Sequence, residues 1–431
     1  MALAKRQGRK RPAAAVSEIE PPAPPKSRRS VKPETETNGV VAVATQGVTP
    51  GAVLVFGEGV SGQLGLTMDV TEKPLPCAVP NVVDIIDVAA GGMHTVCLTS
   101  DHKLITFGCN DEGALGRETN DEEGTEGIPG NVEIPGKIVQ ISAGDSHTAA
   151  LLENGSVYVF GTFRDNRGPL GLLNTTMEKK PVLLNAHVKF TRIASGAHHL
   201  ALLGVDGNIY TAGCGEQGQL GRVSERTSTR DSRHGPVNLL TPMLIRSKAK
   251  FVGKFTNVWT GSYNTLAKDK MGNIHVWGLN NYKQLGMEEN LIFHPVVALS
   301  FSGHDWKKIA GGEHHTLALD NAGDVYALGR KEYGRLGLGD NCEDAPIPKK
   351  VDFGPNKKIV DISCGSFTSF ALADDGILYS WGMGSSMLGV GGEETDLWTP
   401  TQVKGKQLQG KKIVRVESGG QHTVILVNPT A

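Results

Sequence analysis

The chain has 431 residues, with 44 Lys or Arg against 45 Asp or Glu and a formal net charge of −1 at pH 7. Its hydrophobic content of 39% excludes a wholly disordered protein, and its 55 glycines are well above the usual ~7% of residues. No run of about 18 apolar residues is present, so we expect no membrane span and no membrane partner. Six cysteines without a CxxC pair argue against a zinc ribbon and fit a reducing compartment.

Residues 1–50 form a basic tail in which nine Lys or Arg and four Glu give a net charge of +5, so the rest of the chain carries −6. The tail is rich in Pro and Ala and poor in aromatic residues, which predicts disorder. Two basic clusters resemble a bipartite nuclear-import signal and also suit contact with DNA phosphates, while a merely solvated tail is the alternative. The clusters comprise Lys5, Arg6, Arg9, Lys10 and Arg11, and Lys26, Arg28 and Arg29.

From residue 51 onward the chain repeats one pattern seven times. A strand-like run ends in an aromatic or apolar residue plus Gly, and Leu-Gly follows a few residues later. The first glycines lie 51, 53, 52, 65, 51 and 53 residues apart, and a period near 50 indicates a solenoid, an array or a propeller. The seven first glycines are Gly57, Gly108, Gly161, Gly213, Gly278, Gly329 and Gly382.

Each repeat has room for four short strands joined by Gly-containing turns such as Asn154-Gly155, which predicts antiparallel sheets. Seven such units predict an all-β, seven-bladed β-propeller over residues 51–428. The last unit stops after the strand-like run at 423–427, and the first begins with the run at 52–56. We therefore expect the N-terminal strand to pair with the C-terminal strands and close the ring.

A second motif places a histidine three residues after a glycine in five of the repeats. An architectural role is favoured, although equivalent positions would form a polar crown on one face of the ring. Their spacing suits no metal site, and neither a nucleophile–base set nor a phosphate-binding loop is present, so no metal, cofactor or bond-making chemistry is expected. These histidines are His94, His147, His199, His314 and His422, with Asn264 and Thr368 in the other two repeats.

The third unit departs from the pattern because it is two residues longer than the first between its Phe-Gly and Leu-Gly pairs. The extra length carries Phe163, Arg164, Asp165 and Arg167, which predicts a protruding hairpin tip over residues 162–168. A tolerated loop insertion is the alternative.

The interval between the fourth and fifth units is also longer, and its excess falls in residues 223–250. This segment is basic, so contact with phosphates or with an acidic protein is one interpretation, and an exposed flexible loop is the other. Its cationic residues are Arg226, Arg230, Arg233, Arg246, Lys248 and Lys250.

The seven repeats, the stretches at 107–117 and 213–222 and the inserted Phe163-Arg164-Asp165-Asn166 together resemble the regulator of chromosome condensation family, the chromatin-bound guanine nucleotide exchange factors of the small GTPase Ran. The resemblance covers about residues 51–428 and a tail of similar character. It implies a nuclear, chromatin-associated exchange factor that is not an enzyme. The partners it implies are Ran on one propeller face and the nucleosome on the other, and an import receptor fits the basic tail.

The family also implies roles for individual positions. The hairpin with Phe163, Arg164 and Asp165 would push against the GTPase, and Asp145, His198 and His314 match positions tied to exchange. His94, Arg222 and His422 match GTPase-binding positions. Arg226, Arg230 and Arg233 resemble a loop that docks on the histone acidic patch, and Arg246, Lys248 and Lys250 resemble DNA-backbone contacts that Lys5, Arg6, Arg9, Lys10 and Arg11 would extend.

Two family aspartates are absent, because Val60 and His198 stand in their places. The alternative to exchange is therefore a chromatin-binding propeller scaffold with weak or no exchange activity. A light-sensing propeller like the plant ultraviolet-B receptor needs a cluster of tryptophans on one face. The five tryptophans of this chain are expected at unlike repeat positions, which disfavours such a sensor. An enzyme is disfavoured because no acid/base pair can be located.

Overall fold

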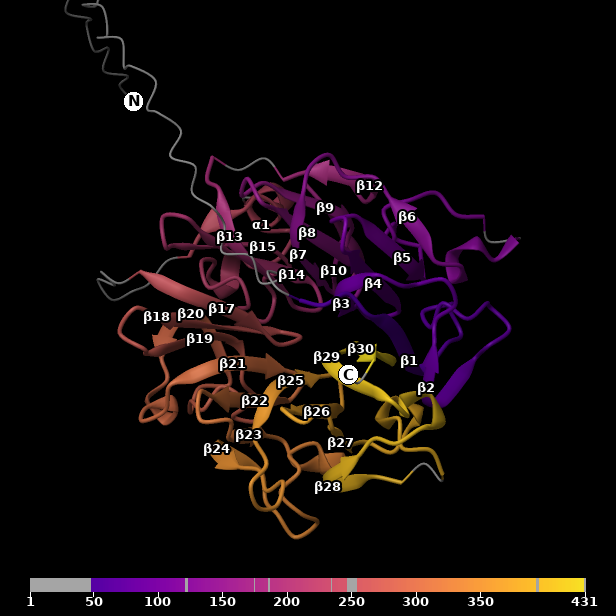
Figure 1. Ribbon diagram of the computed structural model, residues 1–431. Helices are drawn as coiled ribbons and strands as arrows, with labels where there is room; N and C mark the ends of the chain where they lie inside the picture. The colour runs from indigo at the N-terminus through magenta and orange to yellow at the C-terminus, as the bar shows by residue number, and fades with distance from the viewer. Residues whose placement is uncertain are drawn as a thin grey trace, which may run out of the picture. The chain divides into compact units, whose positions relative to one another are not determined.

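Seven four-stranded antiparallel sheets make up the part of the chain that the structure describes. The structure is a computed structural model that describes residues 48–429 except 121–122, 174, 185–186, 234, 246–253 and 393–394. The sheets follow one another as blades around a central axis (Figure 1). The predicted seven-bladed β-propeller is confirmed, while residues 1–47 of the predicted tail lie outside the described residues.

Each blade has an inner, a second, a third and an outer strand. The inner strands are β3 (Ile85–Ala90), β7 (Ile138–Ala143), β13 (Phe190–Ser195), β17 (Phe255–Thr260), β21 (Trp306–Gly311), β25 (Ile359–Cys364) and β29 (Lys411–Ser418). The second strands are β4 (His94–Thr99), β8 (His147–Leu152), β14 (His199–Gly204), β18 (Asn264–Asp269), β22 (His315–Asp320), β26 (Thr368–Ala373) and β30 (His422–Pro429).

The third strands end in the Phe-Gly pair or its equivalent. They are β1 (Ala52–Glu58), β5 (Leu104–Gly108), β9 (Val157–Gly161), β15 (Ile209–Gly213), β19 (Ile274–Leu279), β23 (Val325–Gly329) and β27 (Leu378–Gly382). The outer strands are β2 (Glu72–Ala78), β6 (Gly130–Val132), β12 (Glu178–Leu183), β16 (Met243–Leu244), β20 (Leu291–Val297), β24 (Ala345–Lys350) and β28 (Leu397–Gln402).

A few short elements lie between these strands. A hairpin of β10 (Phe163–Asp165) and β11 (Gly168–Gly171) follows β9, and one short helix, α1 (Gly235–Leu240), precedes β16. Single 3-10 turns are η2 (Thr125–Gly127), η3 (Glu225–Thr227), η4 (Leu299–Phe301), η5 (Glu332–Gly334), η6 (Ser386–Leu388) and η7 (Lys406–Leu408).

The ring closes within one blade whose strands come from both ends of the chain, in the order β2-β1-β30-β29. β1 pairs antiparallel with β30, from Ala52 opposite Val427 to Gly57 opposite His422. The indigo β1 and the yellow β30 therefore belong to the same sheet (Figure 1). This confirms the predicted closure and leaves no unpaired strand edge between the first and last units.

The repeated Phe-Gly and Leu-Gly pairs contact each other across neighbouring blades. Gly65 has a φ of +64°, and a Cβ on it would lie 2.8 Å from the ring of Phe107. Gly57 has a φ of +113°, and its Cβ would lie 2.7 Å from the backbone of His422. Glycine is required at both places, because the backbone conformation and the close approach each exclude a side chain.

The aromatic residue of the Phe-Gly pair fills the core between blades. It is Phe56, Phe107, Phe160, Trp277 or Trp381 in five of the seven units, and each of these side chains is fully buried. Trp277 and Trp381 thus share one repeat position, so the expectation that all tryptophans occupy unlike positions was wrong for this pair. Both tryptophans share this repeat position because it is a core position that large aromatic side chains fill.

The loops that join inner to second strands form one end of the ring, which we call the glycine-loop face. It comprises residues 91–93, 144–146, 196–198, 261–263, 312–314, 365–367 and 419–421. Neighbouring loops are joined by backbone hydrogen bonds, such as Asp145 N to Ala197 O at 2.9 Å and Gly420 N to Gly91 O at 3.1 Å. The loops approach so closely that a Cβ on Gly419 would lie 2.0 Å from Gly91 O.

Candidate functional site

The extra residues of the third unit form the predicted hairpin, which follows the end of β9 at the glycine-loop face. Asn166 and Arg167 are exposed at its tip, between β10 and β11. Phe163 is 1% exposed and packs at the base of the hairpin, with its ring 4.6 Å from that of His147. The hairpin therefore has a charged and polar tip, and its aromatic residue anchors it to the core instead of protruding as predicted.

Ion pairs hold the hairpin against two neighbouring loops. Arg164 pairs with Glu112, and the backbone N–H of Asn166 donates to Glu216 at 3.2 Å. Asp165 accepts two hydrogen bonds from Arg230, one of them from Nε at 2.6 Å. Since the Asp165 side chain is only 3% exposed, this bidentate pair is the best-shielded contact of the hairpin.

The position of Arg230 differs from the family-based expectation, which assigned the hairpin and the 223–250 segment to opposite propeller faces. The structure joins them, through Arg230 and Asp165 and through a second, exposed pair of Arg167 with Asp231. Arg226 and Arg233 of the same segment are exposed to solvent. Arg246, Lys248 and Lys250 lie outside the described residues, as do Lys5, Arg6, Arg9, Lys10, Arg11, Lys26, Arg28 and Arg29.

Asp145 and His198 lie next to each other on the glycine-loop face. Their Oδ2 and Nε2 atoms are 3.5 Å apart, and the side chains are 46% and 18% exposed. Desolvation by the surrounding loops raises the pKa of Asp145, opposed by His198, and lowers the pKa of His198, opposed by Asp145. The Asp145 side chain keeps about half of its surface in solvent, and His198 beside it, with its lowered pKa, is a neutral imidazole that can donate one hydrogen bond and accept one.

His314 also lies on this face, but it is not the repeat histidine that the sequence indicated. Gly311 pairs with Thr316 as Ala90 pairs with Thr95, so His315 holds the position of His94. The sequence alignment matched Gly311 with Gly91, whereas Gly312 bonds His315 O as Gly91 bonds His94 O and is therefore the equivalent glycine. His314 stands in the position of His198, where its ring packs edge-on against Tyr282 at 4.9 Å.

The repeat histidines are buried, and four of them bond a hydroxyl group of the next blade, namely His94, His199, His315 and His422. His94 Nε2 lies 2.9 Å from the hydroxyl of Thr148 in the next blade, and His422 Nε2 lies 2.7 Å from that of Thr95. Burial lowers the pKa of His94 to about 4 and that of His422 to about 3, so both are neutral. At 1% and 0% exposure both side chains are buried between blades in this conformation, and the GTPase contact that the resemblance implies for them stays a prediction.

Arg222 is likewise buried, at 7% exposure. Its guanidinium donates to the backbone carbonyls of Asn238 at 2.7 Å and Leu239 at 3.0 Å, and its Nε donates to the carbonyl of Thr211 at 3.2 Å. These bonds tie α1 to β15 and shape the segment that carries Arg230. The predicted direct contact of Arg222 with a GTPase is therefore not available in this conformation.

Several residues of the face were not singled out from the sequence. Glu112 and Glu216 hold the hairpin, and Arg330 stacks 4.5 Å over the ring of Tyr282 beside His314. Both glutamates stand three or four residues after a Phe-Gly or Ala-Gly pair, in loops that return to the glycine-loop face. A search for charged residues at this offset in every repeat would have found them.

Val60 stands in place of a family aspartate. Its side chain is 56% exposed, in the loop that follows β1. Neighbouring Ser61 reaches the sulfur of Met93 on the glycine-loop face, at 3.8 Å. An exposed valine here removes a charge from the edge of that face without altering the core.

No three His, Cys, Asp or Glu side chains in the described part of the chain are grouped so that they could hold a metal ion. Nor does any described helix have the length and hydropathy needed to cross a bilayer.

Known proteins match the chain over most of its length. The family model described as RCC1-like domain matches residues 52–425. The regulator of chromosome condensation of Xenopus laevis is 47% identical over 400 residues, which cover 91% of this chain and 94% of that protein. The guanine nucleotide exchange factor SRM1 of Saccharomyces cerevisiae is 31% identical over 435 residues, which cover 88% and 87%.

Two solved structures share the architecture. Prp20p from Saccharomyces cerevisiae, whose binding to Gsp1p and histones has been described with its crystal structure, superposes with a TM-score of 0.81 at 30% identity, covering 89% of this chain and 93% of that one. Yeast RCC1 (Prp20) bound to Kap60 gives a TM-score of 0.82 at 29% identity, covering 94% and 96%.

Proposed function

The chain belongs to the RCC1-like family, and from this premise we propose that it is a guanine nucleotide exchange factor for the small GTPase Ran that acts while bound to chromatin. It promotes release of GDP and loading of GTP in the nucleus. It makes and breaks no covalent bond, so it is not an enzyme in the usual sense. The observation that carries this function is the locked hairpin of β10 and β11, with its exposed tip at the glycine-loop face.

Exchange needs only a difference in binding free energy. A factor that binds the nucleotide-free GTPase more tightly than the nucleotide-bound form weakens nucleotide binding by the same factor. A rigid wedge can supply that difference, because its contacts form fully only when the nucleotide site is displaced. Here Arg164 pairs with Glu112, and Asp165 pairs with Arg230. Phe163 is buried at the base of the hairpin, so the hairpin can remain rigid when it contacts the GTPase.

The Asp145–His198 pair and His314 lie on the same face as this hairpin and supply polar contacts of the GTPase interface. Asp145 contributes an accessible carboxyl group. His198 puts a neutral imidazole where the family has an aspartate, and His314 is neutral as well, since burial lowers the pKa of both histidines. With Val60 as the other departure, the interface carries less negative charge than the family pattern, which predicts slower association with a basic GTPase surface.

Chromatin is the second proposed partner. Arg226 and Arg233 are exposed cations that suit the histone acidic patch, and a tail of residues 1–50 would add contacts to the DNA backbone. The same tail is proposed to bind an import receptor, which is supported by the Kap60 complex of the yeast relative. The domain organisation we propose is this tail followed by the propeller of residues 51–428.

One assay tests exchange and its main alternative. We expect micromolar protein to accelerate the release of labelled GDP from Ran, and His198→Asp to increase the rate because it restores a carboxylate. A chromatin-binding scaffold without exchange activity is the second candidate, favoured by Val60 and His198. Nucleosome binding with no acceleration of GDP release, and no gain from His198→Asp, would establish that alternative.

A further inference from the structure

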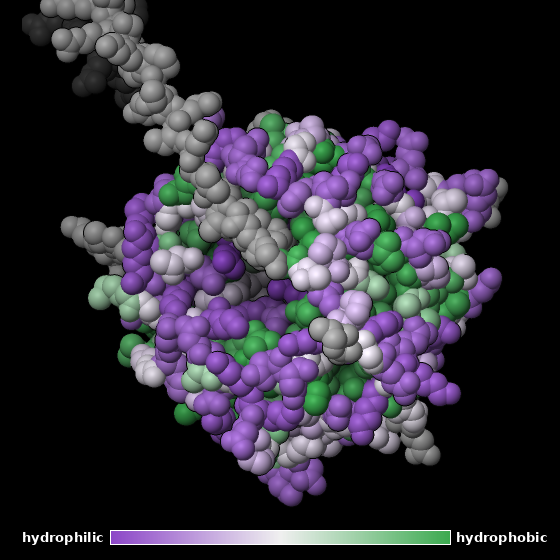
Figure 2. Space-filling view, viewed as in Figure 1, coloured by the Kyte–Doolittle hydropathy of each residue, from purple (hydrophilic) through white to green (hydrophobic). Residues whose placement is uncertain are grey.

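The inner strands of the seven blades enclose a central cavity of about 580 Å³. At the glycine-loop face the cavity narrows to a ring of backbone that includes Gly91, Gly144, Gly196, Gly261 and Gly419. Figure 2 shows a hollow with hydrophilic side chains near the centre of the face turned to the viewer. We call this cavity, which is polar and narrows at the glycine-loop face, the central channel. The function proposed above assigns it no role.

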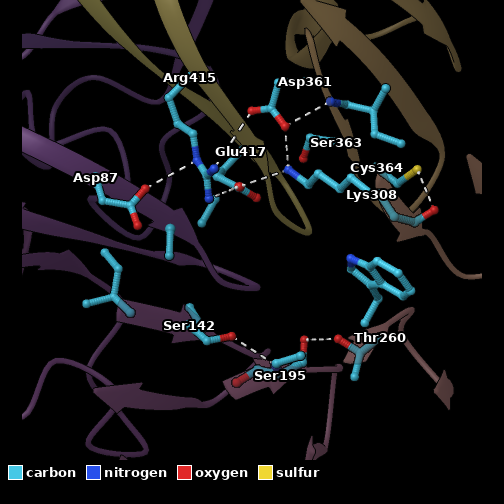
Figure 3. Close-up of a pocket in the computed structure, with 18 of the residues that line it drawn as sticks. Asp87, Ser142, Ser195, Thr260, Lys308, Asp361, Ser363, Cys364, Arg415 and Glu417 are labelled. Carbon is cyan, nitrogen blue, oxygen red and sulfur yellow. Dashed lines mark hydrogen bonds and ion pairs between the residues drawn. The ribbon is translucent and has the colours of Figure 1, made fainter. Parts of the chain in front are cut away.

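Equivalent positions of six inner strands each place one polar side chain in the cavity wall, namely Asp87, Gln140, Arg192, Lys308, Asp361 and Arg415. Most of the charges are on one side (Figure 3), where Arg415 lies 3.2 Å from Asp87 and 2.9 Å from Glu417. Lys308 lies 2.7 Å from Asp361 and 3.6 Å from Glu417. The three carboxylates of the cavity wall are thus each paired with a cation of the wall.

Arg192 is the exception in this ring. It lines the cavity, yet no described residue accepts a hydrogen bond from it or forms an ion pair with it. Burial and the charge of Arg415 both lower the pKa of Arg192. Counting Lys307 as well, the wall holds four cations against three carboxylates, so it carries one excess positive charge.

Further hydrogen-bond donors lie on β13, which carries Arg192, and on the neighbouring inner strands β7 and β17. The hydroxyl of Ser195 is buried without a partner, and that of Ser142 accepts from Ser195 N at 2.9 Å, which leaves its own proton free. The indole N–H of Trp259, which also lines the cavity, donates to no described residue. Figure 3 shows Ser142 and Ser195 across an open space from the paired charges.

An unpaired guanidinium beside several unused donors is the arrangement that binds oxyanions. Guanidinium groups form two parallel hydrogen bonds to a phosphate, and a dianion gains more from the excess positive charge than a carboxylate does. A phosphate group fills only part of a 580 Å³ cavity, so an organic moiety can occupy the remainder beside Trp259.

We propose that the central channel is a binding site for a small phosphate-bearing anion, held by Arg192 with Ser142, Ser195 and the indole N–H of Trp259. The paired charges on the opposite wall set the width of the site and do not bind the phosphate. Phosphate esters bind there more tightly than carboxylates of similar size, because they accept more hydrogen bonds and carry more charge.

The test is a titration of the full-length protein with inorganic pyrophosphate, followed by calorimetry and by tryptophan fluorescence at constant ionic strength. We expect saturable binding that Arg192→Gln weakens by about tenfold or more, the loss of a charged hydrogen-bond partner. Arg233→Gln, which removes an exposed arginine outside the channel, serves as the matched control and should bind like the unchanged protein. Binding of pyrophosphate to the basic tail is common to all three proteins and cancels in the comparison.

Further variants separate binding from folding. Arg192→Lys should recover part of the affinity, and Trp259→Phe should remove the fluorescence signal while calorimetry still detects binding. Succinate at the same concentration should bind more weakly than pyrophosphate. Equal affinity of Arg192→Gln and the unchanged protein, or no saturable binding beyond that of chloride, would overturn the proposal.

Discussion

The pair of Arg230 and Asp165 connects the exchange hairpin to the basic segment at 223–250, and Arg230→Gln tests what it contributes. The substitution leaves Asp165, at 3% exposure, without its bidentate partner. Removing one partner from a fully buried ion pair costs about 3–5 kcal/mol. Because Arg230 is 26% exposed, water can replace part of the lost contact, and we expect about 1–3 kcal/mol, which corresponds to roughly 5- to 150-fold.

We expect this loss to appear in kcat/KM for GDP release from Ran, measured without nucleosomes so that chromatin binding does not contribute. Asp165→Asn should have a similar effect, and the double variant should be little worse than either single one. Arg226→Gln, an exposed arginine in the same segment, is the control and should exchange at the unchanged rate. Effects of the two single variants that add independently would refute a functional link between hairpin and segment.

Three predictions concern the stability of the ring. His422→Ala removes the bond to Thr95 and leaves a cavity, so the free energy of unfolding should fall by about 2–4 kcal/mol in denaturant titrations. In the folded protein the pKa values of His94 and His422 are about 4 and 3, so the unfolded chain binds more protons than the folded one below about pH 6.5. The free energy of unfolding should therefore fall as the pH drops from about 6.5 towards 4, by up to about 1.4 kcal/mol per pH unit for each histidine. Gly419→Ala forces a Cβ to within 2.0 Å of Gly91 O, so thermal melting should show a loss above about 3 kcal/mol, and an unchanged melting temperature would contradict the tight ring.

The repeat spacing predicted the fold well because each unit packs on its neighbours through the same few contacts. The Phe-Gly and Leu-Gly pairs that recur in the sequence are the residues through which neighbouring blades contact each other, as Gly65 against Phe107 shows. Closure was predictable for a related reason: the strand ending at Phe56 lacked a preceding partner, and the strand after His422 lacked a following one. In the structure these two strands pair.

The site was less predictable, since it depends on contacts between distant residues. Asp165 and Arg230 are 65 positions apart in the sequence. No repeat spacing relates the insertion in the third unit to the long segment that follows the fourth unit. His314 was placed one residue out of register because two glycines are consecutive here, and strand pairing shows that Gly312, not Gly311, is the equivalent of Gly91. Phe163 was expected at the hairpin tip, but its hydrophobic surface is buried against His147.

The central claim is that the hairpin of β10 and β11 drives nucleotide release, and stopped-flow measurement of labelled GDP leaving Ran tests it most directly. The comparison is between the unchanged protein and a variant in which residues 164–169 are replaced by two glycines, with nucleosome binding and melting temperature measured for both. We predict that the unchanged protein accelerates release and that the variant loses most of this acceleration while it stays folded. A folded variant that releases GDP as fast as the unchanged protein, or an unchanged protein that gives no acceleration, would contradict the claim.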